Sequence, residues 1–314
     1  MDRKPVSVKS YANIAIVKYW GKADAERMIP STSSISLTLE NMYTETKLSF
    51  LPEDTTGDVM YIDDELQGEK ETTKASKVLD LFRTNPNQHV KIETWNNMPT
   101  AAGLSSSSSG LSALVKAANE LFQVGKTQSE LAQIAKFASG SSSRSFFGPL
   151  AAWDKNSGDV YQVETDLKLA MIMLVLTDQK KPVSSRDGMK LCTETSTSFP
   201  EWIKQSEQDY EDMLGYLKAN DFPAVGELTE ANALRMHQTT STANPPFSYL
   251  TDASYQAMDK VKALRASGEQ CYFTMDAGPN VKVLCLEEDL DRLAEHFRKD
   301  YEVIVSRTKE LPDA

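Results

Sequence analysis

Hydrophobic and polar residues alternate in short stretches over much of the first hundred positions, and this period of two is typical of half-buried β-strands. The segment "VSVKSY" alternates and then becomes apolar, which predicts a strand running into a turn or a second strand. Alternation at residues 35–39, and again at 44–50, predicts strands of an antiparallel sheet. "KASKVLDLFRT" has helical spacing, whereas "HVKIETWNN" places Val90 and Ile92 on one face of another strand.

Between residues 110 and 140 the pattern changes to the period of a helix. Apolar residues recur there at helical spacing: Leu111, Leu114, Val115, Ala118 and Phe122. The next segment, "TQSELAQIAKFASG", predicts a helix that starts with a capping box of Thr127 and Glu130 and ends at Gly140 as its C-cap.

The second half of the chain alternates between strand and helix patterns. "PLAAWDKNSGDVYQVE" predicts a hairpin, and "LKLAMIMLVLTD" predicts a buried strand that is too short to span a membrane. Three helices are expected after Asp187, and the last part of the chain, from "QCYFTMD" to "YEVIVSR", predicts a β–turn–β–α–β unit. A shift in composition near residues 178–187 divides the chain into expected domains 1–183 and 184–314, and the predicted class is α+β.

Composition narrows the classes of partner. The 314 residues suffice for one large domain or two ordinary ones, and 40% hydrophobic with 25% charged residues is typical of a folded protein. The formal net charge of −11 makes nucleic acid and anionic membranes poor partners. An anionic ligand would therefore need a local cluster of basic groups and backbone N–H donors.

The three cysteines, Cys192, Cys271 and Cys285, form no C-x-x-C pair, which favours a reducing cytoplasm over a disulfide framework or a zinc ribbon. There is neither an N-terminal apolar segment nor a run of about 18 apolar residues. We therefore expect a soluble cytoplasmic protein with no membrane partner. The histidines also lie in no ligand-like pattern: His89, His237 and His296.

A serine-rich segment, "NNMPTAAGLSSSSSG", lies between a predicted strand and a strongly amphipathic helix. The N-terminus of that helix offers unpaired N–H groups and the positive end of a dipole, both of which favour phosphate. Gly103 allows close approach of the backbone, and serine hydroxyls can donate to phosphate or bind Mg²⁺. The segment has no lysine, so it is not a Walker A loop. A flexible linker is the alternative, and the flanking patterns disfavour it.

Three further segments combine basic residues with serines or aromatic residues: "ASGSSSRSFFGP", "KKPVSSRDG" and "KYWGK". Taken singly, the first is typical of a polar loop whose arginine pairs with an acidic residue, and the third of a strand with solvated lysines. Arg144 among serines is nevertheless suited to bidentate binding of an anion. Together the segments predict a pocket for more than one phosphate group.

These motifs carry a family resemblance. "PTAAGLSSSSSG" is similar to the phosphate loop of the GHMP small-molecule kinases, Pro-x-x-x-Gly-Leu-x-Ser-Ser. Within that superfamily, "NIAIVKYWGK", "ASGSSSRSFFG", "SSRDGM" and "YFTMDAGPNV" resemble the diphosphomevalonate decarboxylases, in the family's order and over nearly the whole chain. "KYWGK" and "MDAGPN" are specific to that branch, and the overall character is similar to its streptococcal type.

The resemblance implies a two-domain GHMP-kinase fold, with an N-terminal unit like ribosomal protein S5 domain 2 and a ferredoxin-like C-terminal unit. It implies decarboxylation of (R)-5-diphosphomevalonate to isopentenyl diphosphate, with ATP as co-substrate, Mg²⁺ as cofactor and a homodimeric enzyme. A kinase of the same superfamily that phosphorylates a mevalonate-like alcohol and stops there is the alternative. A non-catalytic phosphate-ligand or RNA-binding module is a third hypothesis, and the acidic charge weighs against RNA.

The resemblance also implies roles for individual residues. Asp276 is the expected catalytic aspartate, as proton acceptor or as orienting group, and Lys18 is its charged neighbour. Expected substrate contacts are Tyr19, Trp20, Gly21, Lys22, Ser139, Gly140, Ser141, Ser142, Ser143, Arg144, Ser185 and Arg186. Expected ATP contacts are Pro99, Ala102, Gly103, Leu104, Ser105, Ser106, Ser107 and Ser108, with Ser106 also expected to bind Mg²⁺. Lys74 and Lys77 are candidates for one further basic residue of the family.

Overall fold

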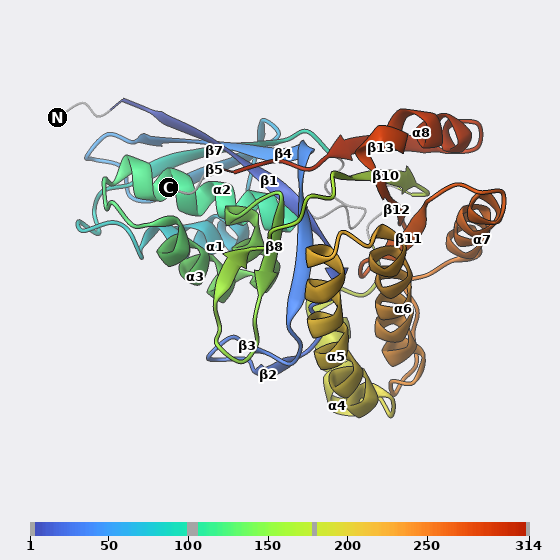
Figure 1. Cartoon of the computed structure of the whole chain (residues 1–314). Coiled ribbons are helices and arrows are strands. Elements are labelled where there is room, and N and C mark those ends of the chain that lie inside the picture. The colour runs from blue at the N-terminus through green and yellow to red at the C-terminus, as the bar shows by residue number, and fades with distance from the viewer. Residues whose placement is uncertain (1–3, 99–105, 178–180, 312–314) are drawn as a thin grey trace.

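The computed structural model describes residues 4–98, 106–177 and 181–311, which form two sheets covered by helices (Figure 1). The first sheet has seven strands, in the order β6-β5-β7-β4-β8-β9 with β1 also on β4. Its strands are β1 (Val6–Val17), β4 (Ser34–Phe50), β5 (Val59–Ile62), β6 (Glu65–Leu66), β7 (Val90–Asn96), β8 (Leu150–Trp153) and β9 (Val160–Gln162). A small ribbon joins β2 (Lys22–Asp24) to β3 (Ile29–Pro30).

Three helices and a 3-10 helix pack on one face of this sheet: α1 (Glu69–Leu79), α2 (Ser106–Leu121), α3 (Gln128–Ala138) and η1 (Gly140–Phe146). Apolar residues at helical spacing on α2, including Leu114 and Ala118, contact Val90 and Ile92 in the same core. The predicted hydrophobic face of this helix therefore covers the strand face that the sequence predicts to be buried.

The two alternating stretches at 35–39 and 44–50 belong to one long strand, β4, instead of two. Its first part pairs with β8 and its second part with β7, while β1 pairs along most of its length. Because β1 spans both parts, the ladder continues where the hydrophobic pattern is interrupted. The register shifts between Tyr11 and Asn13, and such irregularities redirect side chains.

The second sheet has four antiparallel strands in the order β11-β12-β10-β13. They are β10 (Leu169–Val175), β11 (Tyr272–Met275), β12 (Val281–Leu286) and β13 (Glu302–Arg307). The helices of this half of the chain are α4 (Ser185–Thr195), α5 (Phe199–Lys218), α6 (Phe222–Ser241), α7 (Asp252–Ala266), η2 (Glu287–Asp289) and α8 (Leu290–Arg298). The α+β class is confirmed.

A continuous core joins the two sheets. Ile14 and Ile16 of β1 share one apolar cluster with Met171 and Met173 of β10 and with Met213 of α5. On the other face of the second sheet, α7 and α8 cover a separate core (Figure 1). Because β1 ends against this shared core, the segment after Val17 emerges where the two halves of the molecule meet.

The end of α3 differs from the prediction. The capping box of Thr127 and Glu130 is present, but the C-cap is Ser139 in an extended conformation, so the prediction of a Gly140 C-cap is wrong. A Cβ added to Gly140 would lie 2.8 Å from the Trp153 ring. Glycine is therefore needed there because η1 packs closely, and not because the backbone turns left-handed.

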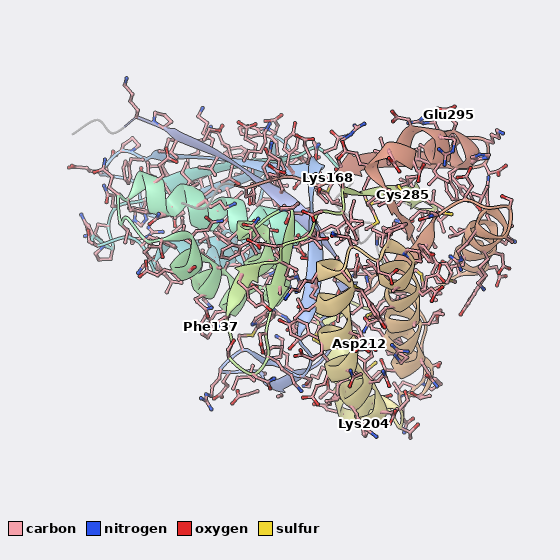
Figure 2. All side chains as sticks on the ribbon, in the orientation of Figure 1. Phe137, Lys168, Lys204, Asp212, Cys285 and Glu295 are labelled. Carbon is pink, nitrogen blue, oxygen red and sulfur yellow. The ribbon has the colours of Figure 1, made fainter. Side chains whose placement is uncertain are left out.

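All three cysteines are buried free thiols, among them Cys285 on β12 (Figure 2). In the part of the chain that the structure describes, none of the helices combines the length and the apolar character that crossing a membrane requires.

Candidate functional site

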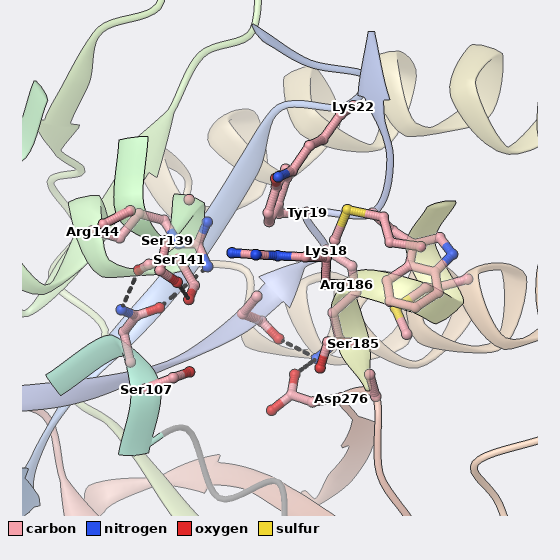
Figure 3. Close-up of a pocket in the computed structure, with 18 of the residues that line it drawn as sticks. Lys18, Tyr19, Lys22, Ser107, Ser139, Ser141, Arg144, Ser185, Arg186 and Asp276 are labelled. Carbon is pink, nitrogen blue, oxygen red and sulfur yellow. Dashed lines mark hydrogen bonds and ion pairs between the residues drawn. The ribbon is translucent and has the colours of Figure 1, made fainter. Parts of the chain in front are cut away.

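A cavity of about 400 Å³ is lined by both halves of the molecule (Figure 3). It receives side chains from the segment after β1, from α2, from η1, from the start of α4 and from the loop after β11. Five of its described lining residues are basic: Lys18, Lys22, Arg144, Lys181 and Arg186. Asp276 is the one acidic residue among them. The chain carries a formal charge of −11, so this cavity is a basic site on an acidic protein.

The cavity brings together most of the predicted site residues that the structure describes. Those that line it are Lys18, Tyr19, Trp20, Lys22, Ser107, Ser139, Gly140, Ser141, Arg144, Ser185, Arg186 and Asp276. The predicted contacts at Pro99, Ala102, Gly103, Leu104 and Ser105, and the side chain of Ser106, lie outside the described residues. Lys74 and Lys77, on α1, do not line it.

Asp276 lies directly after β11, between two lysine ammonium groups. Lys18 Nζ donates to Asp276 Oδ1 at 2.8 Å, and Lys282 Nζ lies 3.2 Å from Asp276 Oδ2. Burial by itself would raise the pKa of Asp276, but the two ammonium groups outweigh burial and hold the pKa well below its usual range. The carboxylate is therefore ionised across the physiological pH range.

Lys18 is held by several groups as well as by Asp276. Its Nζ donates to the carbonyl of Ala15 at 2.6 Å, and its backbone N–H donates to Asn232 Oδ1 at 2.8 Å. Asn232 in turn donates to Asp209 Oδ2 at 2.8 Å. Asn232 and Asp209 are both fully buried, so α5 and α6 fix the backbone that carries Lys18.

Arg144 is 3% exposed, and its guanidinium is held by neutral acceptors. It donates to Ser36 Oγ at 2.9 Å, to Ser34 Oγ at 2.6 Å and to Asn13 Oδ1 at 3.2 Å. Burial lowers the pKa of Arg144 to about 10, so the group remains charged at neutral pH. Because these acceptors carry no charge, they orient the guanidinium without neutralising it, which leaves its charge available to an anion in the cavity.

Two serines beside Arg144 have structural contacts. The hydroxyl of Ser142 donates to the carbonyls of Ala135 and Ser139, and that of Ser143 donates to the carbonyl of Gly140. Both side chains are fully buried and neither lines the cavity. These bonds shape η1, while Ser139 and Ser141 line the cavity.

The serines at the start of α2 also differ in whether they line the cavity or pack against the sheet. Ser107 is exposed and lines the cavity. Ser108, predicted to contact ATP, is fully buried, and its Oγ accepts from the backbone N–H of Asn13 at 3.4 Å. Ser109 Oγ lies 2.7 Å from Thr44 Oγ1. Consecutive helical residues point about 100° apart, so only part of the run can face a ligand while the rest packs on the sheet.

Gly21 does not line the cavity, and glycine is needed at this position because of the backbone conformation. Its φ is +115°, and a Cβ there would lie 2.5 Å from the Phe199 ring. The turn at Gly21 separates Trp20 from Lys22, both of which line the cavity. Trp20 is anchored by its indole N–H, which donates to Thr239 Oγ1 at 2.9 Å.

Several residues of the site were missed by reasoning from the sequence. Lys181 bridges two segments, because its Nζ donates to Ser185 Oγ and to the Ala277 carbonyl, each at 2.7 Å. Asn13 bonds both Arg144 and the Ser141 carbonyl. Lys181 could have been found from the sequence, because it lies in "KKPVSSRDG" together with the predicted site residue Ser185.

The oxygen atoms that line the cavity are of the kind that can bind Mg²⁺ together with a nucleotide. Within the described ranges, no group of three or more His, Cys, Asp or Glu side chains is arranged to hold a metal ion. Serine hydroxyls, that of Ser107 at the first turn of α2 among them, do offer oxygen donors in the cavity. Mg²⁺ prefers oxygen ligands and commonly binds through one or two protein groups together with substrate phosphates.

Comparison with known proteins matches both halves of the chain. Residues 10–163 match the diphosphomevalonate decarboxylase-like N-terminal domain, and residues 171–312 match the mevalonate 5-diphosphate decarboxylase C-terminal domain. The mevalonate pyrophosphate decarboxylase of Streptococcus pyogenes is similar in structure, with 66% identity, a TM-score of 0.97 and coverage of 100% of this chain and 99% of that one.

Two other relatives extend the similarity. The diphosphomevalonate decarboxylase of Candida albicans is 31% identical over 94% of this chain and 88% of its own length. A relative called MDDEF, in complex with MVAPP, AMPPCP and magnesium, is 40% identical, with a TM-score of 0.89 and coverage of 98% of each chain.

Proposed function

This chain belongs to the diphosphomevalonate decarboxylase family, and from that premise we propose how the residues of the cavity divide the reaction among themselves. The enzyme converts (R)-5-diphosphomevalonate and ATP to isopentenyl diphosphate, ADP, phosphate and carbon dioxide. One observation carries the assignment of roles: a basic cavity that contains a single described carboxylate, held between two lysines.

The chemistry requires two steps. When carbon dioxide leaves, the electron pair of the C1–C2 bond needs an acceptor, and hydroxide at C3 is a poor leaving group. The C3 oxygen therefore first takes the γ-phosphoryl group of ATP, which releases ADP, and the hydroxyl proton passes to a phosphate oxygen and from there to water. The C3–O bond then breaks with its electron pair leaving on phosphate, and the C1–C2 pair becomes the new double bond between C2 and C3.

Binding of the two anionic reactants falls to different parts of the cavity. Ser107 lies at the first turn of α2, where the helix N-terminus favours the phosphates of ATP. Arg144, Ser139, Ser141 and Lys22 have the chemical types that clamp a diphosphate. Arg186, at the start of α4, is suited to the substrate carboxylate, because a guanidinium can bind it through two parallel hydrogen bonds.

Asp276 is the group proposed to act at the C3 hydroxyl. A carboxylate whose pKa lies well below its usual range is a weak base, so accepting the hydroxyl proton is the less favourable of its two candidate roles. Orienting the hydroxyl and stabilising positive charge that develops at C3 both require an ionised carboxylate. We therefore favour the orienting and electrostatic role.

Mg²⁺ supplies charge neutralisation on the ATP phosphates when it is bound. Among the described residues, the Ser107 hydroxyl at the first turn of α2 is an oxygen donor of the type that would hold it. The assignment of Ser106 as a magnesium ligand, and of the loop from Pro99 to Ser105 as ATP contacts, stays a prediction.

Phosphoryl transfer is common to this enzyme and to a kinase that stops after it, so product analysis separates the two. We expect ADP, inorganic phosphate and carbon dioxide to be released in equal amounts from (R)-5-diphosphomevalonate. ADP formed without phosphate and carbon dioxide would contradict the decarboxylase and leave the kinase. Omitting the diphosphate substrate is the control for ATP hydrolysis.

We also propose that the enzyme is a cytoplasmic homodimer, which the family resemblance supports. Sedimentation velocity on the full chain tests the dimer, because a monomer at micromolar concentration would contradict it. The division at residues 183 and 184 stays a prediction, and the pairing of β10 with β12 and β13 favours a boundary before Leu169.

A further inference from the structure

Lys282 is a buried lysine on the strand that follows Asp276. The β11–β12 hairpin pairs Thr274 with Lys282 and Met275 with Val281, so the loop containing Asp276 returns directly to the strand that carries Lys282. This register brings Lys282 Nζ to 3.2 Å from Asp276 Oδ2. The side chain is 0% exposed.

The two lysines contact opposite oxygens of the carboxylate and differ in access to the cavity. Lys18 lines the cavity and contacts Oδ1, whereas Lys282 contacts Oδ2 and is not among the lining residues. A reactant in the cavity can therefore meet Lys18 and Asp276, while Lys282 contacts the Asp276 carboxylate from outside the cavity lining.

Burying a lysine is costly unless its charge is compensated, which argues that Lys282 has a specific task. Its neighbours on the same strand, Val281 and Val283, are apolar and belong to the core against α7 and α8. A hydrophobic residue at position 282 would satisfy the strand pattern without that cost. The charge is instead placed against the single described carboxylate of the cavity.

We propose that Lys282 is a positioning residue that holds the Asp276 carboxylate on the side away from the cavity and fixes its orientation and its ionised state, while Lys18 pairs with the carboxylate on the cavity side. This inference rests on the proposed function of Asp276. Each carboxylate oxygen has two lone pairs, so pairing one oxygen with each lysine leaves acceptor capacity directed to the cavity.

Other charged or titratable groups also face Asp276. Arg144 of η1 and Lys181 of the loop before α4 add positive charge around it. His237 of α6 is buried, which lowers its pKa to about 4, so this imidazole is neutral at neutral pH. Among the described residues, removing Lys282 therefore leaves Asp276 with one direct ion pair, to Lys18. More distant cations stabilise the ionised carboxylate more weakly.

The test is Lys282→Met, which keeps the length of the side chain and removes the charge. We expect kcat to fall about 10- to 100-fold, because a carboxylate displaced by about 1 Å costs on the order of 10²-fold. KM for both substrates should stay within about threefold, since no contact with the reactants is removed. The acid limb of the kcat/KM profile should move up by about 1–3 pH units, because one of the two cations that stabilise the carboxylate is gone.

Two further variants serve as controls for Lys282→Met. Lys282→Arg retains the positive charge and should restore the acid limb toward its wild-type position. Lys260→Met removes a lysine of α7 that pairs with Asp300 and does not line the cavity, and it should leave kcat and the acid limb unchanged. If Lys282→Met folds poorly, Lys282→Gln replaces it with the same expectations.

The positioning role would be overturned if Lys282→Met or Lys282→Gln kept the wild-type kcat and an unmoved acid limb. If Asp276→Asn were inactive in the same assay, the proposed function would remain intact. An active Asp276→Asn enzyme would instead overturn the proposed function itself. A loss of stability with unchanged kcat and acid limb, measured on the folded fraction, would also overturn the inference, since it would show a purely structural lysine.

Discussion

Replacing Asp276 by alanine is expected to reduce kcat by about 10³-fold or more, while substrate affinity is nearly preserved. The change removes the group proposed to orient the C3 hydroxyl and to stabilise positive charge at C3, and electrostatic groups of this kind each contribute on the order of 10²–10³-fold. The cations proposed to bind the diphosphate remain in place. Steady-state release of ADP gives kcat, and calorimetry with the diphosphate substrate gives the affinity.

Two controls separate chemistry from folding in the Asp276 experiment. Asp276→Asn keeps the shape of the side chain and removes its charge, so it should be almost as inactive as the alanine variant. Asp300→Ala removes a carboxylate that pairs with Lys260 outside the cavity, and it should retain the wild-type rate. A substantial rate in Asp276→Asn would contradict the role assigned to this residue.

Replacing Arg144 by alanine is expected to raise KM for the diphosphate substrate by roughly 10²-fold. Hydrogen bonds to charged groups contribute about 1.5–3 kcal/mol each, and Arg144 is the most deeply buried arginine of the cavity. KM for ATP should change much less, because the α2 N-terminus remains. Initial rates with each substrate varied in turn measure both effects.

Lysine at position 144 is the matched control, since Arg144→Lys keeps the charge and loses the planar fork. We expect this variant to have an intermediate KM. Both substitutions leave hydroxyls of Ser34 and Ser36 without their guanidinium partner, so a moderate loss of thermal stability is also expected. Lower stability with an unchanged KM would show that Arg144 serves the fold and not the substrate.

The sequence predicted which segments build the cavity, but not the direction of every side chain. The strand and helix patterns of the first half place "KYWGK", the serine run and "SGSSSR" in connecting segments or at helix starts, where ligands commonly bind. Ser107 and Ser108 illustrate what was missing. They are chemically identical neighbours, and only the rotation of α2 against β1 decides that one faces the cavity and the other the sheet.

Lys282 and Asn13 could not be predicted because they depend on pairing between strands. Lys282 lies in "VKVLCL", where alternation gives no reason to expect an ion pair across the hairpin. The register of β11 against β12 determines that contact, and a register shift in β1 adjoins Asn13, which bonds Arg144. The resemblance to a known family located Asp276 and Lys18, whereas the network that holds Lys18 through Asn232 required the packed helices.

The fate of the C3 oxygen tests the central claim most directly. We propose that this oxygen accepts the γ-phosphoryl group and then leaves with it. With ¹⁸O at the C3 hydroxyl, mass spectrometry should find one ¹⁸O in each released phosphate and none transferred to water. Unlabelled phosphate together with labelled water would contradict phosphorylation of the C3 oxygen, and with it the roles proposed for the residues of this cavity.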